Sequence, residues 1–515
     1  MTLSVTTLKL VINNMKHKNY KKILLFFAVL GLCFMFHNSS AQAATFAVAG
    51  GNDTIAVDSS CSLSEAIQNI NDQAQTNADC AAGDGNDTIT LPNSTITLTG
   101  NLPSITATGS ITISGSGPNS VIDGANTYAS IVNTDSSASS MNISGFTVLH
   151  AYQGFTIGGQ DCSVTNIVVI AGLNNSGIYC NGTLSVNSLD VTGASTPAGS
   201  GLMVEGNNTL TAVLDYVRVH DGIGSNSDKA PLYFQNIADL TVDHSEVSNF
   251  GCSGTCLFGG MTILGASDQD TAVIRNTSIV GNEGGIAGLF LNGDMSVTIQ
   301  NITIADNAAD TVDQFPMSVG GIIYISEHPG TVTLQNVLLS NNTASSGGSP
   351  SNCFLGTVQG FGAASIPTSL GGNLSDDTTC TASFNQSSDF NNVDAGLDSF
   401  ELDGATKVYT LLATSPAVDG GTAILGVTDD QRGTSRPHGG GYDIGAYETT
   451  LAKVASGTGS GSSQNPSTQA GVAKTVPKVP DTGVTLIKNN PYVAAGASAL
   501  AAIVLLWASR KYQSR

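Results

Sequence analysis

The sequence predicts an all-β protein: a right-handed parallel β-helix with a short N-terminal capping helix, preceded by a signal peptide and followed by a C-terminal transmembrane helix. Three observations predict this fold class. Short segments of alternating apolar and polar residues recur through residues 141–342, charged residues make up only 11% of a 515-residue chain that holds 59 glycines, and an apolar run lies near each end. Alternation favours strands with one buried face, and a recurring unit of this length favours a solenoid.

The first 43 residues have the order of a secretion signal. A basic stretch at residues 16–22 is followed by an apolar run at residues 23–36 and by the small-residue site Ala41-Gln42-Ala43. The apolar run is too short to span a membrane comfortably. We therefore expect a signal peptide at residues 1–43, with Met15 as an alternative start and an uncleaved anchor as the alternative interpretation.

Residues 44–140 are expected to form an N-terminal cap and the first coils. Ser62-Leu-Ser-Glu65 has the pattern of a capping box at the start of a helix. Leu63, Ala66, Ile67 and Ile70 then follow one apolar helical face. A short helix at this point would close the first coil.

The repeated coils are expected at residues 141–372. Four copies align without gaps, and each carries an asparagine at the same position, namely Asn166, Asn276, Asn301 and Asn336. Stacked asparagine side chains can hydrogen-bond to one another along a coil corner, which favours a parallel β-helix. A β-propeller is the alternative, although its blades would be longer and more regular.

Eight of the nine cysteines follow the signal peptide in four local pairs: Cys61 with Cys80, Cys162 with Cys180, Cys252 with Cys256, and Cys353 with Cys380. An even number in an exported chain predicts disulfide bonds, and pairing between sequence neighbours is the expected connectivity. Buried thiols are the alternative. The spacing matches no Cys/His metal motif, so no metal site is predicted.

The charge is distributed very unevenly. All 39 Asp and Glu residues but only nine of the 18 Lys and Arg residues lie between positions 44 and 483, where the net charge is therefore −30. Such a surface repels polyanions. Nucleic acid is therefore not expected as a partner.

One charged cluster is a candidate site. Looser copies begin at Ile143, Val186, Leu214 and Val242. Aligning all the copies places Asp190, Arg218 and Glu246 at one outward position of consecutive coils, and Asp215, Asp243 and Arg275 at another, with His220 and His244 nearby. Neighbouring strands lie about 4.8 Å apart, so Arg218 is expected between two carboxylates. The cluster is either a polysaccharide site, since carboxylate pairs carry glycoside hydrolysis, or a salt-bridge ladder between coils. The catalytic candidates are Asp190, Asp215, Arg218, Asp243 and Glu246.

Few other residues suggest a ligand. The single tryptophan, Trp507, lies in the C-terminal apolar run, which leaves Tyr216 and Tyr233 as platforms for a sugar ring. Two Gly-Asn-Asp-Thr-Ile segments, at Gly51 and Gly85, are similar to calcium-binding repeats but lie 34 residues apart, whereas such sites need tandem copies. No cofactor is therefore expected, and calcium is the one cation left open.

The C-terminal part divides into a closing segment at residues 373–448, a flexible linker at residues 449–478, and a tail at residues 479–515. Arg432, Arg436, Asp443 and Glu448 are expected to form an ion-paired end cap. The tail contains Val479-Pro480-Asp481-Thr482-Gly483, an apolar run at residues 491–508, and then Arg510 and Lys511.

This tail resembles the sortase sorting signals of Gram-positive-type surface proteins, with Val479 in place of the usual leucine. The resemblance implies that a sortase-type transpeptidase cuts between Thr482 and Gly483 and joins Thr482 to the envelope. A single-span membrane anchor is the alternative, and Arg510 and Lys511 keep the end cytoplasmic in both cases.

Two further segments carry a resemblance. Cys61-Ser-Leu-Ser-Glu-Ala-Ile67 resembles the "CSLREA" segment that opens a family of secreted bacterial β-helix proteins, with Ser64 in place of arginine. Asp443-Ile-Gly-Ala-Tyr-Glu448 resembles the segment that closes these proteins. The resemblance implies the architecture of residues 45–448, but no single activity.

These observations predict an exported, cell-surface adhesin or display rod, anchored to the wall or by one membrane span, that contacts glycans or another cell. The alternative is an anchored polysaccharide lyase or glycoside hydrolase that uses the acidic cluster. The expected partners are a sortase-type enzyme, the membrane, and a polysaccharide or host-cell ligand.

Overall fold

The computed structural model describes residues 43–453 except 133–137, 171–175, 197–200, 225–228, 311–317, 326–329, 345–348, 355–356, 359–361 and 364. The predicted signal segment up to Gln42, most of the linker, the sorting motif and the C-terminal apolar run lie outside the described residues. No helix within the described residues is long and apolar enough to cross a membrane.

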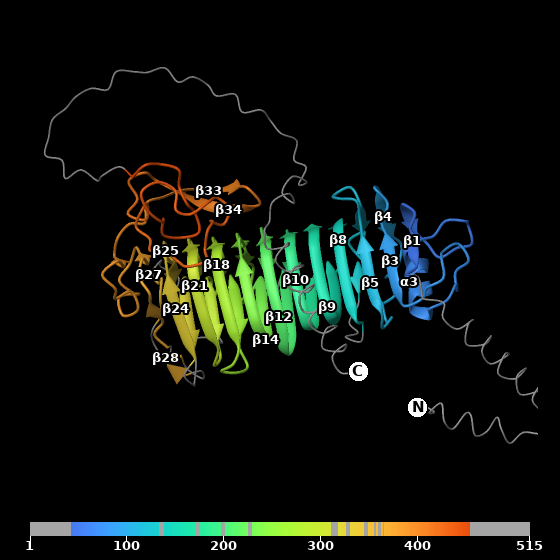
Figure 1. The fold of residues 1–515 in the computed structure, drawn as a ribbon, viewed down its shortest axis with the longest axis horizontal. Helices are drawn as coiled ribbons and strands as arrows, with labels where there is room; N and C mark the ends of the chain where they lie inside the picture. Colours follow the sequence, from blue (N-terminus) through green and yellow to red (C-terminus); the bar gives the residue numbers. More distant parts are fainter. Residues whose placement is uncertain are drawn as a thin grey trace, which may run out of the picture. The chain divides into compact units, whose positions relative to one another are not determined.

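The described chain is mostly β structure, and one large sheet with parallel pairing dominates it (Figure 1). Its first strands are short: β1 (Thr45–Ala47), β2 (Gly51–Asp53), β3 (Asn86–Thr90), β4 (Thr95–Leu98), β5 (Ser110–Ser114), β6 (Val121–Asp123) and β7 (Ile131–Val132). Longer strands follow: β8 (Ser140–Leu149), β9 (Phe155–Ile170), β10 (Ser176–Thr192), β12 (Leu202–His220), β14 (Leu232–Asp243), β18 (Thr271–Val280) and β21 (Ser296–Ala305). The others are β15 (Glu246–Ser248), β17 (Met261–Leu264), β20 (Leu289–Asn292), β23 (Ile322–Ile325), β24 (Thr331–Gln335), β25 (Leu338–Ser340), β30 (Thr368–Ser369), β31 (Leu374–Ser375) and β32 (Phe390–Asn391).

Four smaller sheets lie beside it. They comprise β11 (Ser195–Thr196), β13 (Ile223–Gly224) and β16 (Gly251–Cys252); β19 (Glu283–Gly284), β22 (Ala308–Ala309), β26 (Thr343–Ala344) and β27 (Ser349–Pro350); β28 (Thr357–Val358) and β29 (Gly362–Ala363); and β33 (Leu397–Asp403) and β34 (Thr406–Leu411).

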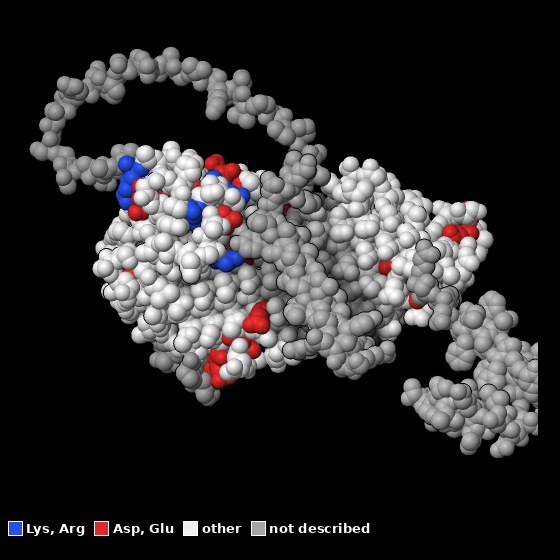
Figure 2. All heavy atoms as spheres, in the orientation of Figure 1, with Lys and Arg blue, Asp and Glu red and all other residues white. Residues whose placement is uncertain are grey.

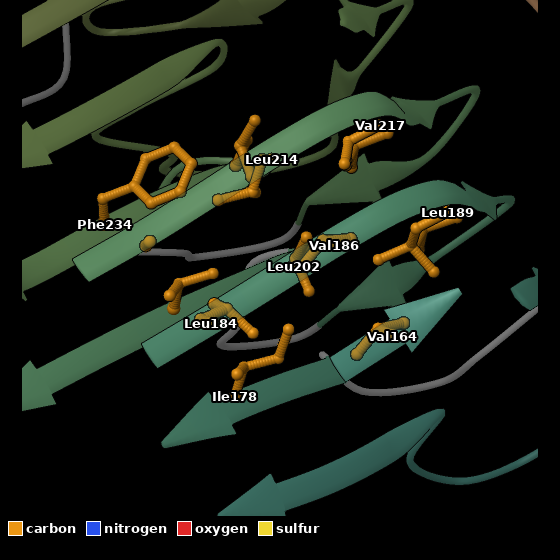
Figure 3. Packing of buried hydrophobic residues seen from close by; sticks show 14 of the residues in the cluster. Val164, Ile178, Leu184, Val186, Leu189, Leu202, Leu214, Val217 and Phe234 are labelled. Carbon is orange, nitrogen blue, oxygen red and sulfur yellow. The ribbon is translucent and has the colours of Figure 1, made fainter. Parts of the chain in front are cut away.

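Each coil pairs in parallel with the coils before and after it. In one row, for example, Val186 of β10 lies between Val164 of β9 and Leu214 of β12. All three side chains are buried, and Figure 3 shows them stacked with Leu189 and Val217 in the interior. Stacking is what buries the apolar face of each coil, and the arrangement is consistent with a parallel β-helix solenoid.

The predicted N-terminal helix is confirmed as α3 (Leu63–Asp72). The backbone N–H of Glu65 donates to Ser62 Oγ (3.3 Å), and the N–H of Ser62 donates to Glu65 Oε2 (3.0 Å), which completes the capping box. Leu63, Ala66 and Ile67 belong to the same buried cluster as the first coils. The helix therefore covers apolar residues that the first coil would otherwise expose.

The predicted asparagine register is also confirmed. Asn276, Asn301 and Asn336 occupy equivalent positions of successive coils, and all have a positive φ, which turns the chain at a corner. Asn336 Nδ2 donates to Asn301 Oδ1 (2.9 Å), and Asn301 Nδ2 donates to Asn276 Oδ1 (3.5 Å). Asparagine tolerates this left-handed conformation better than most residues, so the column fixes both the turn and the stacking.

The structure pairs the cysteines as the sequence predicted. Disulfide bonds join Cys61 to Cys80, Cys162 to Cys180, Cys252 to Cys256, and Cys353 to Cys380. Each bond links residues that are near in sequence, between 4 and 27 positions apart, and the bond from Cys162 to Cys180 joins the neighbouring strands β9 and β10.

The chain after the last coil lies along the side of the solenoid. Residues 397–449, called the return segment below, begin with the antiparallel hairpin β33–β34. Leu411, Val418 and Ile444 of this segment pack against Leu338 and Leu374 of the coils. In Figure 1 the return segment, coloured orange, lies beside β18, β21 and β25. The sequence predicted a cap at the end of the stack, and the structure corrects this: the segment turns back over earlier coils.

Candidate functional site

The first row of the predicted cluster has the expected register. Asp190 pairs with Arg218, and Arg218 pairs with Glu246, on three consecutive coils. Arg218 Nη1 donates to Asp190 Oδ2 (3.1 Å), and Arg218 Nε donates to Glu246 Oε2 (2.9 Å). One guanidinium group therefore bridges the carboxylates of both neighbouring coils.

The second row lies on the other side of the corner. Asp215 pairs with Asp243, and Arg275 Nε donates to Asp243 Oδ2 at 2.6 Å. Asn276, which is hydrogen-bonded to Asn301 of the next coil, donates its Nδ2 to Asp243 Oδ1 (3.0 Å). Asp243 of the second row is thus hydrogen-bonded directly to the asparagine column that stacks the later coils.

His220 closes one end of the cluster. Its Nε2 lies 2.9 Å from Asp190 Oδ1, and its Nδ1 lies 2.6 Å from Asp221 Oδ2. Burial disfavours the charged ring, but the hydrogen bonds to both aspartates outweigh burial and raise the pKa of His220 above its usual value. The ring therefore lies between two carboxylates, and both of them favour its charged form.

His244 occupies the corner column itself, one coil before Asn276. It stacks on Tyr216 of the preceding coil with 4.7 Å between ring centroids, and its Nδ1 lies 2.7 Å from Asp215 Oδ1. Burial lowers its pKa, but the hydrogen bond to Asp215 and the carboxylates of Asp429 and Asp243 raise the pKa to about 10. The stacked pair of rings replaces the asparagines in this part of the column.

The return segment covers the cluster. The backbone N–H of Lys407 donates to Glu246 Oε2 (2.6 Å), and Asp429 Oδ1 lies 3.6 Å from His244 Nε2. Glu246 is fully buried and Asp243 is 6% exposed, whereas the side chain of Asp190 remains 31% exposed. Sequence reasoning placed both rows on an outward face, and the structure corrects their exposure: Glu246 and Asp243 are buried, whereas the side chains of Asp190 and Arg275 remain about a third exposed.

Charged atoms are sparse on the face in Figure 2, and the basic atoms gather at the upper left beside acidic ones, in the region that Figure 1 draws as the return segment. Arg436 and Glu448 form a fully buried ion pair there (2.7 Å). Arg432 binds Asp430 (2.6 Å) and Asp403 (2.7 Å). Three of the four residues expected in an ion-paired cap are therefore paired, although the cap lies within the return segment.

Asp443, the fourth residue of that cap, accepts backbone hydrogen bonds from Asp419 (2.8 Å) and Thr449 (2.6 Å). Burial raises the pKa of its carboxyl group to about 7. Asp443 therefore joins the backbone at Asp419 to the backbone at Thr449, where the return segment ends.

The two segments considered for calcium use their carboxylates within the chain. Asp53 accepts hydrogen bonds from the backbone N–H of Ser64 (3.0 Å) and from its hydroxyl group (2.5 Å), at the start of α3. Asp87 accepts from the backbone N–H groups of Asp84 and Gly85. In the part of the chain that the structure describes, no group of three or more His, Cys, Asp or Glu side chains could hold a metal ion.

The arrangement is chemically an ion-pair network. Asp190, Asp215, Asp243 and Glu246 each accept hydrogen bonds from arginine, histidine, asparagine or the backbone. A glycosidase needs two carboxyl groups that flank a substrate bond. These four carboxylates instead bind one coil to the next and bind the return segment to the coils.

Sequence reasoning missed the residues that cover the cluster. Lys407 is 161 positions from Glu246, and Gln431 is 153 positions from Ser278, to which it is hydrogen-bonded. Alternation within strands predicts register between coils, but no local pattern predicts such distant contacts.

A second buried asparagine column was also missed. Asn282, Asn307, Asn342 and Asn352 hydrogen-bond in series, at 3.0, 2.9 and 2.8 Å. The sequence does contain a pattern that indicates this column. Asn282, Asn307 and Asn342 lie six positions after Asn276, Asn301 and Asn336, respectively.

Comparisons of the chain with protein-family models, with curated proteins and with solved structures find no match. The residues of the predicted sorting motif, Val479 to Gly483, lie outside the described part of the chain.

Proposed function

We propose that the protein is a non-catalytic rod on the cell surface, acting as an adhesin or as a display scaffold for contact with glycans or another cell. The rod is a right-handed parallel β-helix, exported by the N-terminal signal and anchored through the C-terminal tail. A sortase-type transpeptidase or a single membrane span holds it there.

One observation carries the non-catalytic part of the proposal: Arg218 bridges Asp190 and Glu246 while the return segment buries Glu246. A ladder of ion pairs stabilises a stack of coils, whereas an acid–base pair must meet a substrate. The four disulfide bonds support export, because such bonds persist in oxidising compartments.

A polysaccharide panel tests the absence of catalysis. The chain is incubated with a range of polysaccharides, with and without calcium, and cleavage is measured beside the Asp243→Ala variant. Binding without cleavage is the expected result. Cleavage by the wild type that Asp243→Ala abolishes would establish the enzyme alternative and refute the rod.

The anchor is tested separately. Thr482→Ala should abolish covalent attachment to the wall, because the sorting-type signal implies that the carbonyl of Thr482 is the group transferred. Cell walls are digested and the attached chain is measured, with the neighbouring Thr485→Ala as the control. Unchanged wall attachment in Thr482→Ala would leave a membrane span as the anchor.

A further inference from the structure

The return segment binds four successive coils. The Lys407 N–H donates to Glu246 (2.6 Å), the Ser278 hydroxyl donates to Gln431 Oε1 (2.6 Å), and the Ala446 N–H donates to Thr303 Oγ1 (3.0 Å). On the next coil, the Thr422 N–H donates to Asn336 Oδ1 (2.8 Å). Glu246, Ser278, Thr303 and Asn336 are all buried, so these bonds are shielded from water.

The end of the return segment is held most firmly at one residue. Glu448 accepts from Arg436 Nη1 (2.7 Å), from the His438 N–H (2.7 Å) and from the Asp443 N–H (3.1 Å) through its side chain. Its backbone N–H donates to Asp430 (3.0 Å), and its carbonyl oxygen accepts from Arg432 (2.6 Å). Glu448 directly precedes the predicted linker, and it is fully buried.

Chain order decides how a pull on the C-terminus is resisted. Tension applied beyond Lys453 must first break the contacts of Glu448. It must then break the contacts with the coils in the chain order Ala446, Gln431, Thr422 and Lys407. Only afterwards does it reach β32, the last strand of the parallel sheet. Without the return segment, the same tension would detach the outermost coil by breaking its hydrogen bonds one after another.

We propose that the return segment is a tension clamp: the buried Glu448–Arg436 pair receives the pull from the stalk, and the segment protects the terminal coils from being peeled away. The inference rests on the proposed surface anchoring, since only an anchored rod is pulled at its C-terminus. The mechanical order can be measured without any cell wall, so the clamp and the anchor can fail independently.

Single-molecule pulling on the full chain, held by its two ends, tests the clamp. The first unfolding event should release the return segment, residues 397–449, which is about 18 nm of contour length at roughly 3.4 Å per residue. Later events should correspond to single coils, whose asparagines are 25 or 35 residues apart. A first event of coil size, with the return segment still in place, would overturn the proposal.

Two further measurements sharpen the test. Glu448→Gln should raise the rate of the first event at zero force by on the order of 100-fold, because it leaves the buried Arg436 without its charge partner. Glu401→Gln, an exposed glutamate in β33, is the matched control and should change no event. An unchanged first event in Glu448→Gln contradicts the clamp.

Reduction of the disulfide bonds gives a readout that needs no variant. The return segment contains no cysteine, whereas Cys353 and Cys380 close a loop with a separation of 27 residues just before it. A reductant should therefore lengthen a later event by about 9 nm and leave the first event unchanged. A lengthened first event would show that tension reaches the coils before the return segment has detached.

Discussion

Replacement of Arg218 by methionine is the most direct test of the ion-pair ladder. Methionine keeps much of the apolar stem of arginine but removes the charge, so packing changes little. Glu246, which is fully buried, then keeps only the Ser248 hydroxyl and the Lys407 N–H as partners. Asp190 is partly exposed and remains solvated.

The expected loss follows from these differences in burial. Removing one partner of a buried ion pair costs roughly 3–5 kcal/mol, and the two remaining hydrogen bonds of Glu246 place the loss near the lower end. Losing the contact with the solvated Asp190 adds less than about 1 kcal/mol. Arg218→Met should therefore destabilise the protein by about 3 kcal/mol.

Urea unfolding followed by far-ultraviolet circular dichroism measures this loss, since Trp507 lies outside the β region and tryptophan fluorescence would not report on the coils. Arg275→Met is the comparison, because Arg275 is 32% exposed and its partner Asp243 keeps Asn276; it should cost about 1 kcal/mol. Adding Glu246→Gln to Arg218→Met should restore part of the stability, because the unpaired charge is gone. Equal small losses in both single variants, or no recovery in the double variant, would refute the reasoning.

Three other outcomes follow from the structure. His244 has a folded-state pKa of about 10 against an ordinary value near 6.5, so its contribution to stability is complete below about pH 6.5 and is lost as the pH rises towards 10. The urea midpoint of the wild type should therefore be higher at pH 6.5 than at pH 9.5, and this difference should be smaller in His244→Gln. Asn307→Ala should cost about 2–3 kcal/mol in urea unfolding, because it removes buried bonds to Asn342 and to the Ile279 carbonyl group, whereas Ala at the exposed Asn52 should cost less than about 0.5 kcal/mol. Replacing both Cys353 and Cys380 by alanine should destabilise the protein by about 3.5 kcal/mol, against about 2 kcal/mol for Cys252 and Cys256, because the sequence separations are 27 and 4 residues; the two double variants are compared by thermal unfolding.

The register between coils could be predicted because it depends on short-range patterns that repeat. Alternation fixes which residues of a strand are buried, and alignment of the copies, gapless or looser, then fixes which residues are neighbours on successive strands. Asp190, Arg218 and Glu246 were aligned correctly for this reason, as was the column of Asn276, Asn301 and Asn336. The helix α3 was predicted from its capping residues, which are also local.

The exposure of the cluster could not be predicted, because it depends on a contact between distant parts of the chain. The alternating pattern places Glu246 on the outward face of its strand, and within its own coil that is correct. Lys407 reaches it from 161 positions away, and the sequence around Lys407 resembles an ordinary charged hairpin. A residue that is outward in a coil is buried when another segment folds over it, so strand periodicity alone predicts orientation but not burial.

The distribution of basic residues links the ladder to the return segment. The structure describes seven Lys and Arg residues, and five of them (Arg218, Arg275, Lys407, Arg432 and Arg436) lie in the ion-pair ladder or in the return segment that covers it. Burying carboxylates there requires these cations, since an unpaired buried charge is costly. Most other acidic residues that the structure describes have no arginine or lysine in their ion pairs, and the sequence of residues 44–483 is strongly negative as a whole. Like-charged rods repel one another, which favours separate rods over lateral association in the function proposed here.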